Sequence, residues 1–253
     1  MKTILITGAT AGFGLATAKK FYQQGYNLIL TGRRKERFEE IETLLSKEGN
    51  GKIQFLHFDV RDNNATKAAI SSISEDLKTS LSILVNNAGL ALGKSTIDEG
   101  SIDDWDNMID TNVKGLLYIS KAVIPILKKT GGGHIVNIAS VAGKEVYPGG
   151  NVYCASKHAV DALSKAMRID LLKDNISVSN IAPGAADTEF SLVRFKGDKQ
   201  MATDVYEGYT PLFAEDIADA VDFVAHRPSH VNIDDMLIMP RAQASATLFK
   251  KDN

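Results

Sequence analysis

The chain has 253 residues, 44% of them apolar and 24% charged, and its formal net charge is −2 at pH 7. This composition is ordinary for a globular protein and excludes the basic surface of a nucleic-acid-binding protein. No apolar run approaches the roughly 20 residues of a membrane-spanning helix. The single cysteine, Cys154, excludes an intramolecular disulfide and suits a reducing compartment. We therefore expect a cytoplasmic protein whose partners include neither nucleic acid nor membrane.

Short runs rich in β-branched residues alternate with longer stretches of helical periodicity. Strands are predicted at Thr3–Ile6, Asn27–Thr31, Ile53–Phe58, Ile83–Asn86, His134–Ile138, Ser177–Ile181 and Met236–Met239. Helices are predicted at Gly14–Gln24, Lys35–Lys47, Asn64–Asp76, Trp105–Lys128, Val152–Lys173 and Ala214–Ala225. This alternation predicts an α/β fold, a doubly wound sheet of seven parallel strands with helices on both faces. Since no linker or repeat interrupts the pattern, we expect residues 1–253 to form a single domain.

A glycine-rich turn joins the first predicted strand to the first helix. Glycine allows a tight turn and a close approach of the backbone to a pyrophosphate. The N-terminus of the following helix offers free N–H groups to the same anion. The alternative is an ordinary strand–helix turn, but the position at the first junction favours a nucleotide site. Its predicted members are Gly8, Ala9, Thr10, Ala11, Gly12, Phe13 and Gly14.

The second predicted strand ends in Thr31-Gly32-Arg33-Arg34. Proteins that bind NAD place an acidic residue about 20 residues after the glycine turn, where it holds the ribose 2′-hydroxyl. Here two guanidinium groups stand in that region, and guanidinium groups bind phosphate well. The alternative is a basic pair facing solvent at the start of a helix, where the helix dipole disfavours cations. The pair Arg33 and Arg34 therefore favours NADP over NAD.

The next two strands end at the same edge of the predicted sheet. Asp59 and Val60 end the third strand, where the adenine amino group of a nucleotide would be met. Asn86, Ala88 and Gly89 follow the fourth strand, which neighbours the first in the usual doubly wound order. The run Asn-Asn-Ala-Gly by itself indicates only a turn. In this position it extends the predicted nucleotide site.

The spacing of Ser140, Tyr153 and Lys157 indicates a site for proton transfer. Tyr153 and Lys157 are four residues apart and share one face of a predicted helix. A cation beside a phenol favours the phenolate and lowers its pKa from about 10. A tyrosine tuned in this way exchanges a proton with a substrate oxygen near neutral pH. The Ser140 hydroxyl, delivered from a preceding turn, is placed to hold that oxygen.

A long segment without predicted strands or helices follows the sixth strand, from Pro183 to about Tyr209. Ligands of open α/β sheets bind at the carboxyl ends of the strands. Loops of this length are usually functional. We therefore predict a substrate lid at about residues 184–209.

The order and spacing of these segments resemble the short-chain dehydrogenase/reductase family over essentially the whole chain. The resemblance implies a single-domain Rossmann fold that transfers a hydride between NADP(H) and an alcohol or carbonyl substrate, usually as a tetramer or dimer. We therefore expect a homotetramer. The matching motifs are Thr7–Gly14, Asn86–Gly89, Asn112, Ser140, Tyr153-x-x-x-Lys157 and Pro183-Gly184.

By this resemblance, Tyr153 is the acid/base, Lys157 lowers its pKa and holds the nicotinamide ribose, and Ser140 orients the substrate oxygen. Asn112 is similar to the family's helix-bending asparagine, which carries a water in a proton relay to the lysine. The segment after the sixth strand is similar to the one that contacts the nicotinamide carboxamide, but it lacks the usual aliphatic residue two after its glycine. Its members are Pro183, Gly184, Ala185, Ala186 and Thr188.

Within the family, the chain is most similar to the NADP-dependent 3-hydroxy acid (serine/allo-threonine) dehydrogenase group, which includes malonic semialdehyde reductases. The stretch Glu189–Asp198 in the predicted lid is the best support. A hydroxy acid needs a cation for its carboxylate, and Arg194 and Lys196 are the candidates, with Arg241 as a third choice. Tyr147 is expected to line the same pocket.

Two other functions remain open from the sequence. One is the reduction of uncharged carbonyl, sugar or 3-oxoacyl substrates by the same chemistry. The other is a non-catalytic protein that senses NADP, which loss of the serine, tyrosine or lysine would favour. No metal is predicted, because His134 and His158 have no partners at the spacing of metal ligands.

Overall fold

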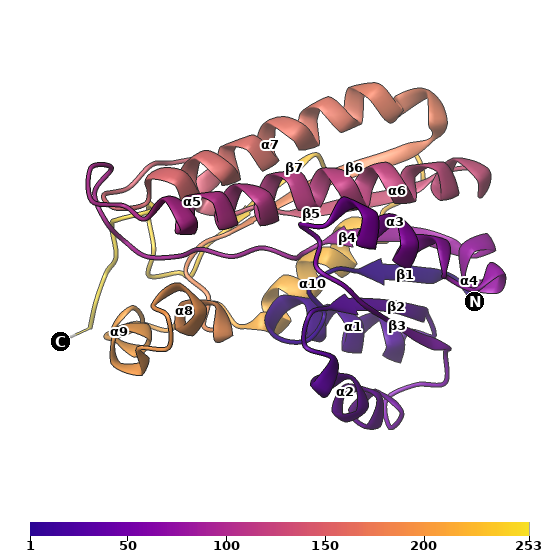
Figure 1. The fold of residues 1–253 in the computed structure, drawn as a ribbon, viewed down its shortest axis with the longest axis horizontal. Helices are drawn as coiled ribbons and strands as arrows, with labels where there is room; N and C mark the ends of the chain where they lie inside the picture. The colour runs from indigo at the N-terminus through magenta and orange to yellow at the C-terminus, as the bar shows by residue number, and fades with distance from the viewer. Residues whose placement is uncertain (253) are drawn as a thin grey trace.

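A computed structural model describes residues 1–252 (Figure 1). Its sheet has seven strands, all paired in parallel, in the order β3-β2-β1-β4-β5-β6-β7. The predicted α/β class, strand number and parallel pairing are therefore confirmed. The strands are β1 (Thr3–Ile6), β2 (Asn27–Gly32), β3 (Ile53–His57), β4 (Leu81–Asn86), β5 (Gly133–Ile138), β6 (Ile176–Pro183) and β7 (Asp235–Ile238).

Helices cover both faces of the sheet. In Figure 1, α6 and α7 lie on one side of the strands, and α1 and α2 lie on the other. The remaining helices pack beside these layers or form the segment between β6 and α10. The helices are α1 (Gly12–Gln23), α2 (Phe38–Leu45), α3 (Asn63–Ser71), α4 (Glu75–Thr79), α5 (Ile102–Ile109), α6 (Leu116–Lys129), α7 (Asn151–Leu171), α8 (Glu189–Arg194), α9 (Lys199–Asp204) and α10 (Ala214–Ala225).

The apolar strands divide their side chains between two cores, because successive residues of a strand point to opposite faces. Leu5 and Leu84 pack with the apolar residues of α3, α6 and α7. Ile4, Ile6 and Val85 pack with those of α1, α2 and α10. Burial on both faces explains why these strands read as continuous apolar runs in the sequence.

The sheet places its ligand crevice at one point. β1 pairs with β2 on one side and with β4 on the other, so the chain winds outward from β1 in both directions. At such a reversal, the loops that leave adjacent strands diverge and open a crevice at their carboxyl ends. The glycine turn after β1 and the Asn86–Gly89 turn after β4 therefore flank the same space.

The structure corrects two helical predictions. The helix predicted at Asn64–Asp76 is two helices, α3 and α4, separated at Ser72–Ser74. The helix predicted to begin at Trp105 begins at Ile102, because the Ser101 side chain accepts a hydrogen bond from the Asp104 N–H and caps it. It also contains a π-helical turn at Asp110–Gly115, between α5 and α6.

The predicted irregular lid contains two short helices, α8 and α9. Thr188 caps α8 by accepting a hydrogen bond from the Phe190 N–H, and Asp198 caps α9 by accepting one from the Met201 N–H. Each helix has only six residues and therefore carries too little apolar periodicity to be recognised in the sequence. The capping residues Thr188 and Asp198 were the available sequence signal for the starts of these two helices.

Candidate active site

One large cavity of about 820 Å³ opens along the carboxyl ends of the strands. It joins the glycine turn, the ends of β2 and β4, the start of α7 and the lid. The sequence-predicted residues that line it are Gly8, Thr10, Ala11, Gly12, Phe13, Arg33, Arg34, Asp59, Val60, Ala88, Gly89, Ser140, Tyr147, Tyr153, Lys157, Pro183, Gly184, Ala185, Ala186, Thr188 and Arg194. Four other predicted residues, Ala9, Gly14, Asn86 and Asn112, are absent from this lining.

The glycine turn is packed directly against the end of β4. Gly8 has a φ of +65°, and a Cβ atom at this position would lie 2.9 Å from the Ala88 Cα. A Cβ atom on Gly14 would lie 2.5 Å from the Gly8 carbonyl oxygen. Thr7 Oγ1 accepts hydrogen bonds from the N–H groups of Asn87 and Ala88. Glycine is thus required here by the close approach of two backbones, and Gly14 supports the turn from behind.

Asn86 and Asn87 have different environments. Asn86 is the last residue of β4 and is buried, and its Nδ2 donates to Ser120 Oγ and to Asn137 Oδ1. Asn87 lines the cavity, and its Nδ2 donates to the carbonyls of Thr7 and Gly8. The sequence prediction named Asn86, Ala88 and Gly89 for the nucleotide site, and the structure adds Asn87 to the lining of the cavity.

The two arginines after β2 have different partners. Arg34 donates from Nε and Nη2 to Thr10 Oγ1, at 3.1 and 3.0 Å, and from Nη1 to Glu189 Oε2 at 2.6 Å. The Arg33 side chain is 55% exposed, and its Nη1 lies 3.6 Å from Asp59 Oδ2. Arg33 is thus the freer guanidinium, and Arg34 links the glycine turn to the lid.

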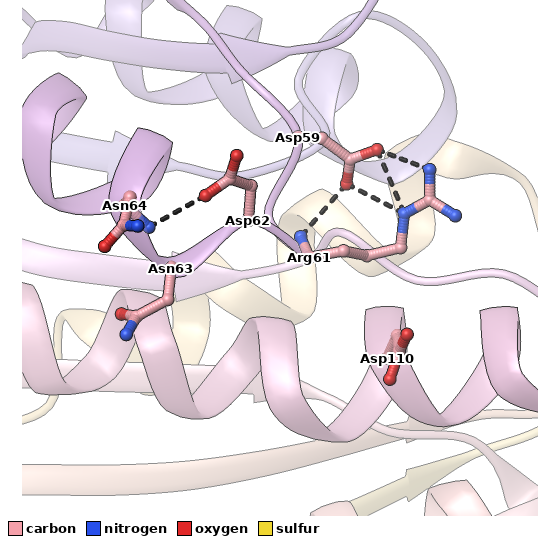
Figure 2. A pocket seen from close by; sticks show the side chains of 6 residues that line it. All are labelled: Asp59, Arg61, Asp62, Asn63, Asn64 and Asp110. Atoms are coloured by element: carbon pink, nitrogen blue, oxygen red, sulfur yellow. Dashed lines mark hydrogen bonds and ion pairs between the residues drawn. The ribbon is translucent and has the colours of Figure 1, made fainter.

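Asp59 is held by Arg61, whose Nε and Nη2 donate to its carboxylate (Figure 2). Burial opposes ionisation of Asp59, but these hydrogen bonds and the nearby Arg33 charge outweigh it and lower the pKa of the carboxyl. Arg61 also donates to Asn107 Oδ1 on α5. Asp59 is therefore a fixed anionic acceptor at the end of β3.

Asp59 and Arg61 also line a second, polar depression with a volume of about 580 Å³. Figure 2 shows the side chains that line it. The Asp62 carboxylate there accepts hydrogen bonds from the N–H groups of Asn64 and Ala65 and caps α3. Asp110 pairs with Lys114 at 2.8 Å. The charged side chains of this depression thus have structural partners, and Asp59 is its only residue that also lines the large cavity.

The three catalytic candidates come from the end of β5 and from α7. Ser140 follows β5, and its Oγ accepts a hydrogen bond from the Ala142 N–H. Tyr153 and Lys157 lie one turn apart on α7 and are 8% and 5% exposed. All three line the cavity. The sequence-predicted trio is therefore brought together.

Lys157 is a buried cation with a single hydrogen bond within residues 1–252. Its Nζ donates to the Ile138 carbonyl at 2.9 Å, at the end of β5. Burial lowers the pKa of Lys157 from 10.5 to about 8. An ammonium has three donors, so two remain for a ligand in the cavity.

The pKa of Tyr153 is shifted in the direction opposite to the expectation. Burial raises it above its ordinary value and the neighbouring Tyr147 adds to this, while Ser140 and the Arg194 charge act to lower it. Desolvation of the phenolate outweighs these favourable neighbours. The protonated phenol is thus the resting form of Tyr153 in this cavity.

Asn112 lies in the π-helical turn and does not reach the cavity with its side chain. Its Nδ2 donates to the Leu90 carbonyl at 2.8 Å and to Ser156 Oγ at 3.0 Å, and its Oδ1 accepts from the Leu90 N–H at 2.8 Å. Both amide hydrogens are used, so Asn112 ties the segment after β4 to α7. The amide hydrogens of Asn112 are therefore not free for the predicted water relay, and that role of Asn112 stays a prediction.

On the substrate side, Arg194 faces two tyrosines. Its Cζ lies 5.5 Å from the ring centroid of Tyr147 and 5.7 Å from that of Tyr153. The other two predicted cations are elsewhere. Lys196 Nζ pairs with Asp104 at 2.8 Å, and Arg241 is exposed and does not line the cavity.

Several residues of the cavity were not predicted. Tyr206 and Glu189 belong to the lid, and Gln243 and Phe249 come from the segment after β7. Gln243 is buried, and its Oε1 accepts a hydrogen bond from the Ala185 N–H at 2.8 Å. No local pattern marks a residue about 60 positions from its partner, so only the fold reveals these members.

Comparison with known proteins identifies the family. A sequence profile described as short chain dehydrogenase matches residues 2–198. The chain belongs to this family. Its relatives include the NADP-dependent 3-hydroxy acid dehydrogenase YdfG of Escherichia coli strain K12, which is 44% identical over 97% of both chains. Sulfoacetaldehyde reductase 2 of Chromohalobacter salexigens is 44% identical over 95% of both chains.

A solved structure described as the closed form of serine dehydrogenase complexed with NADP⁺ is also similar. It is 42% identical, the match covers 99% of this chain and 100% of that one, and the TM-score is 0.92. The predicted Rossmann fold, family and NADP-dependent dehydrogenase class are thus confirmed. Within residues 1–252, no helix has the length and apolarity to cross a membrane, and no group of three potential metal ligands is found.

Proposed function

We propose that this protein is an NADP-dependent dehydrogenase of small 3-hydroxy acids, of the serine, allo-threonine or 3-hydroxypropionate type, acting in either direction. The observation that carries the proposal is the guanidinium of Arg194 within 6 Å of the Tyr153 ring, inside the cavity that also holds Ser140 and Lys157. A cation at this place suits a substrate whose carboxylate lies a few bonds from the reacting carbon.

The cavity fits a dinucleotide with a 2′-phosphate. Gly8 and Gly14 permit the tight turn and close packing that bring the backbone toward a bound pyrophosphate. The partly exposed Arg33 stands at the end of β2, and Lys157 has unused donors at the other end of the cavity. When bound, the nicotinamide accepts the hydride from the alcohol or supplies it to the carbonyl.

The protein's own groups then handle the proton and the geometry. The protonated Tyr153 donates its phenolic proton to the carbonyl oxygen during reduction, and its phenolate form takes the hydroxyl proton during oxidation. Ser140 holds the same oxygen. Lys157 holds the ribose. It also begins the proposed proton relay near Asn112, which exchanges the proton of Tyr153 with solvent. Arg194 orients the substrate carboxylate, so the reacting carbon is held in place.

A second candidate is the reduction of a small sulfonated aldehyde. The relative named sulfoacetaldehyde reductase 2 is as similar to this chain as YdfG is, at 44% identity. A sulfonate and a carboxylate are both anions that a guanidinium binds. The second candidate therefore uses the same residues and differs in the size and shape of the anion.

A panel of substrates separates these candidates. With NADP⁺ we expect turnover of serine, allo-threonine and 3-hydroxypropionate, and much weaker turnover of 3-hydroxypropionamide, which has the same length and no charge. With NADPH, the rates of reduction of sulfoacetaldehyde and of malonic semialdehyde are compared directly. Equal rates with the acid and its amide would contradict the proposal and favour an uncharged substrate. NADPH binding without turnover of any substrate would favour the sensing role.

We also propose a homotetramer in the cytoplasm. Ile169 and Leu172, near the end of α7, are 77% and 76% exposed in one chain, and apolar side chains at such positions suit a subunit interface. The single, buried Cys154 suits a reducing compartment. Light scattering of the purified protein tests the assembly, and a monomer at micromolar concentration would contradict it.

The site assignments are part of the proposal. Residues 184–209, with α8 and α9, are the substrate lid. The residues of the glycine turn and of the ends of β2, β3 and β4 that line the cavity hold the cofactor. Tyr147 lines the substrate end, where burial raises the pKa of its phenol and the Arg194 charge acts to lower it. A crystal structure with NADPH and a hydroxy acid is the direct test.

A further inference from the structure

The lid and the arginines after β2 share one ion-pair network. Glu189, the first residue of α8, accepts from Arg34 Nη1 on Oε2 at 2.6 Å and from Arg37 Nη1 on Oε1 at 2.7 Å. Both carboxylate oxygens are therefore used. Burial acts to raise the pKa of Glu189, but the hydrogen bonds and charges of the two arginines outweigh it and lower that pKa. The carboxylate is ionised at neutral pH.

The same arginines are anchored to the glycine turn. Arg34 makes two hydrogen bonds to Thr10 Oγ1, and Arg37 Nη1 donates to the Thr10 carbonyl at 3.2 Å. The lid also touches the turn directly, since a Cβ atom on Gly12 would lie 3.4 Å from the Thr188 Cβ. The network therefore crosses the cavity from the glycine turn to the start of α8.

The charges of this network suit a cofactor with a 2′-phosphate. Arg33, Arg34 and Arg37 carry three positive charges and Glu189 carries one negative charge, which leaves a surplus of two. A phosphate monoester carries about −1.5 to −2 at neutral pH. Asp59 and Arg61 neutralise each other and do not alter this balance. Glu189 can thus keep its two arginines while Arg33 binds the phosphate.

We propose that Glu189 is a positioning residue that latches the lid to the arginines at the 2′-phosphate end of the cavity and so retards release of the cofactor. This inference rests on the proposed use of NADP. It links recognition at one end of the cofactor to closure of the lid, which carries Arg194 at the other end. Opening α8 requires both hydrogen-bonded ion pairs of Glu189 to separate.

The first test measures NADPH dissociation by displacement and stopped-flow fluorescence, with no substrate present. For Glu189→Gln we expect release about fivefold faster, as for the loss of about 1 kcal/mol from partly exposed ion pairs. Glu207→Gln is the control, because Glu207 is an exposed lid carboxylate without an ion pair within residues 1–252. Release at the wild-type rate, or slower release because the variant no longer repels the phosphate, would overturn the proposal.

A double variant separates a latch from general loosening of the lid. Arg37 does not line the cavity, so Arg37→Gln removes one side of the latch without a direct contact to the cofactor. If the latch is right, Glu189→Gln and Arg37→Gln together release NADPH no faster than the faster single variant. Rates that multiply would show independent effects and reject the latch.

Hydrogen exchange in the cofactor-free protein gives a readout that does not depend on NADP. Peptides that cover residues 188–197 should exchange faster in Glu189→Gln than in the wild type, whereas peptides from α7 should not change. Unchanged exchange in residues 188–197 would reject the latch even if the proposed reaction is correct. Conversely, if none of the proposed substrates is turned over, the exchange rates of residues 188–197 still test the latch, because they require neither substrate nor cofactor.

Discussion

The catalytic cluster and the lid that faces it are held by different kinds of interaction. Lys157 and Asn112 are almost fully buried and are tied to backbone atoms of β5 and of the segment after β4. The lid is held by the half-exposed carboxylate of Glu189 and by the hydroxyl of Tyr206. Buried hydrogen bonds fix geometry at the cost of desolvation, whereas exposed ion pairs separate readily. The first arrangement suits proton transfer, and the second suits a segment that must open for each substrate.

The largest loss of activity is expected for a change at Tyr153, in the buried catalytic cluster. Tyr153→Phe removes the proton donor and should lower kcat about a thousandfold. NADPH affinity, measured by fluorescence titration, should change little. Tyr118→Phe on α6 is the control and should keep wild-type activity, because Tyr118 does not line the cavity. Near-normal turnover by Tyr153→Phe would refute the assigned chemistry.

The burial of Lys157 predicts a cost in stability. Its pKa is about 8 in the folded chain and 10.5 ordinarily, so the unfolded chain holds more protons between these values. The free energy of unfolding therefore rises as pH increases from 8 to 10.5 and is lowered by this residue below pH 8, by about 3 kcal/mol at most. Lys157→Met should abolish activity and yet unfold at higher urea concentration at pH 7.

The difference in the free energy of unfolding between Lys157→Met and the wild type should become smaller as pH rises from 8 toward 10.5. Urea unfolding at pH 7, 9 and 10 measures it. A lysine variant that is less stable than the wild type at pH 7 would show that the hydrogen bond to Ile138 outweighs desolvation. The buried cluster would then stabilise the folded chain, and its fixed geometry would carry no net cost of desolvation.

The next largest effect, on KM, is expected for a change at Arg194. Arg194→Ala should raise KM for an acidic substrate about tenfold to a hundredfold, as for the loss of a hydrogen bond to a charged group. It should leave NADPH affinity nearly unchanged. Lys196→Ala, which removes a neighbouring lid cation paired with Asp104, is the matched control and should have little effect on KM. An unchanged KM in Arg194→Ala would remove the proposed carboxylate site.

The smallest effect is expected at Tyr206. Its hydroxyl donates to the Ala186 carbonyl and bonds to Ser191 Oγ, both at 2.6 Å, and so joins the segment after β6 to α8. Tyr206→Phe should cost about 1 kcal/mol and raise KM a few-fold by loosening the lid. In Tyr209→Phe the lost hydroxyl bonds only to the nearby Val205 carbonyl, so its effect should be smaller. Equal effects of the two variants would contradict the assigned role of Tyr206.

Much of the fold could be read from the sequence because its signals are local. Each strand is a short apolar run, and the glycine turn and the pair of Tyr153 and Lys157 lie within a few residues of one another. The short helices α8 and α9 were missed because six residues show little periodicity. That Asn87 rather than Asn86 lines the cavity became visible only in the structure.

The sequence alone determined the family and the parallel sheet and predicted the catalytic trio, since each depends on residue types at short, regular spacing. The tertiary structure decided the rest. It set the direction of the Tyr153 pKa shift, because desolvation depends on what surrounds the phenol. It also decided the pairing of Arg34 with Glu189, which lie 155 residues apart. Burial and long-range contacts arise only when distant segments pack together, and no spacing along the chain records them.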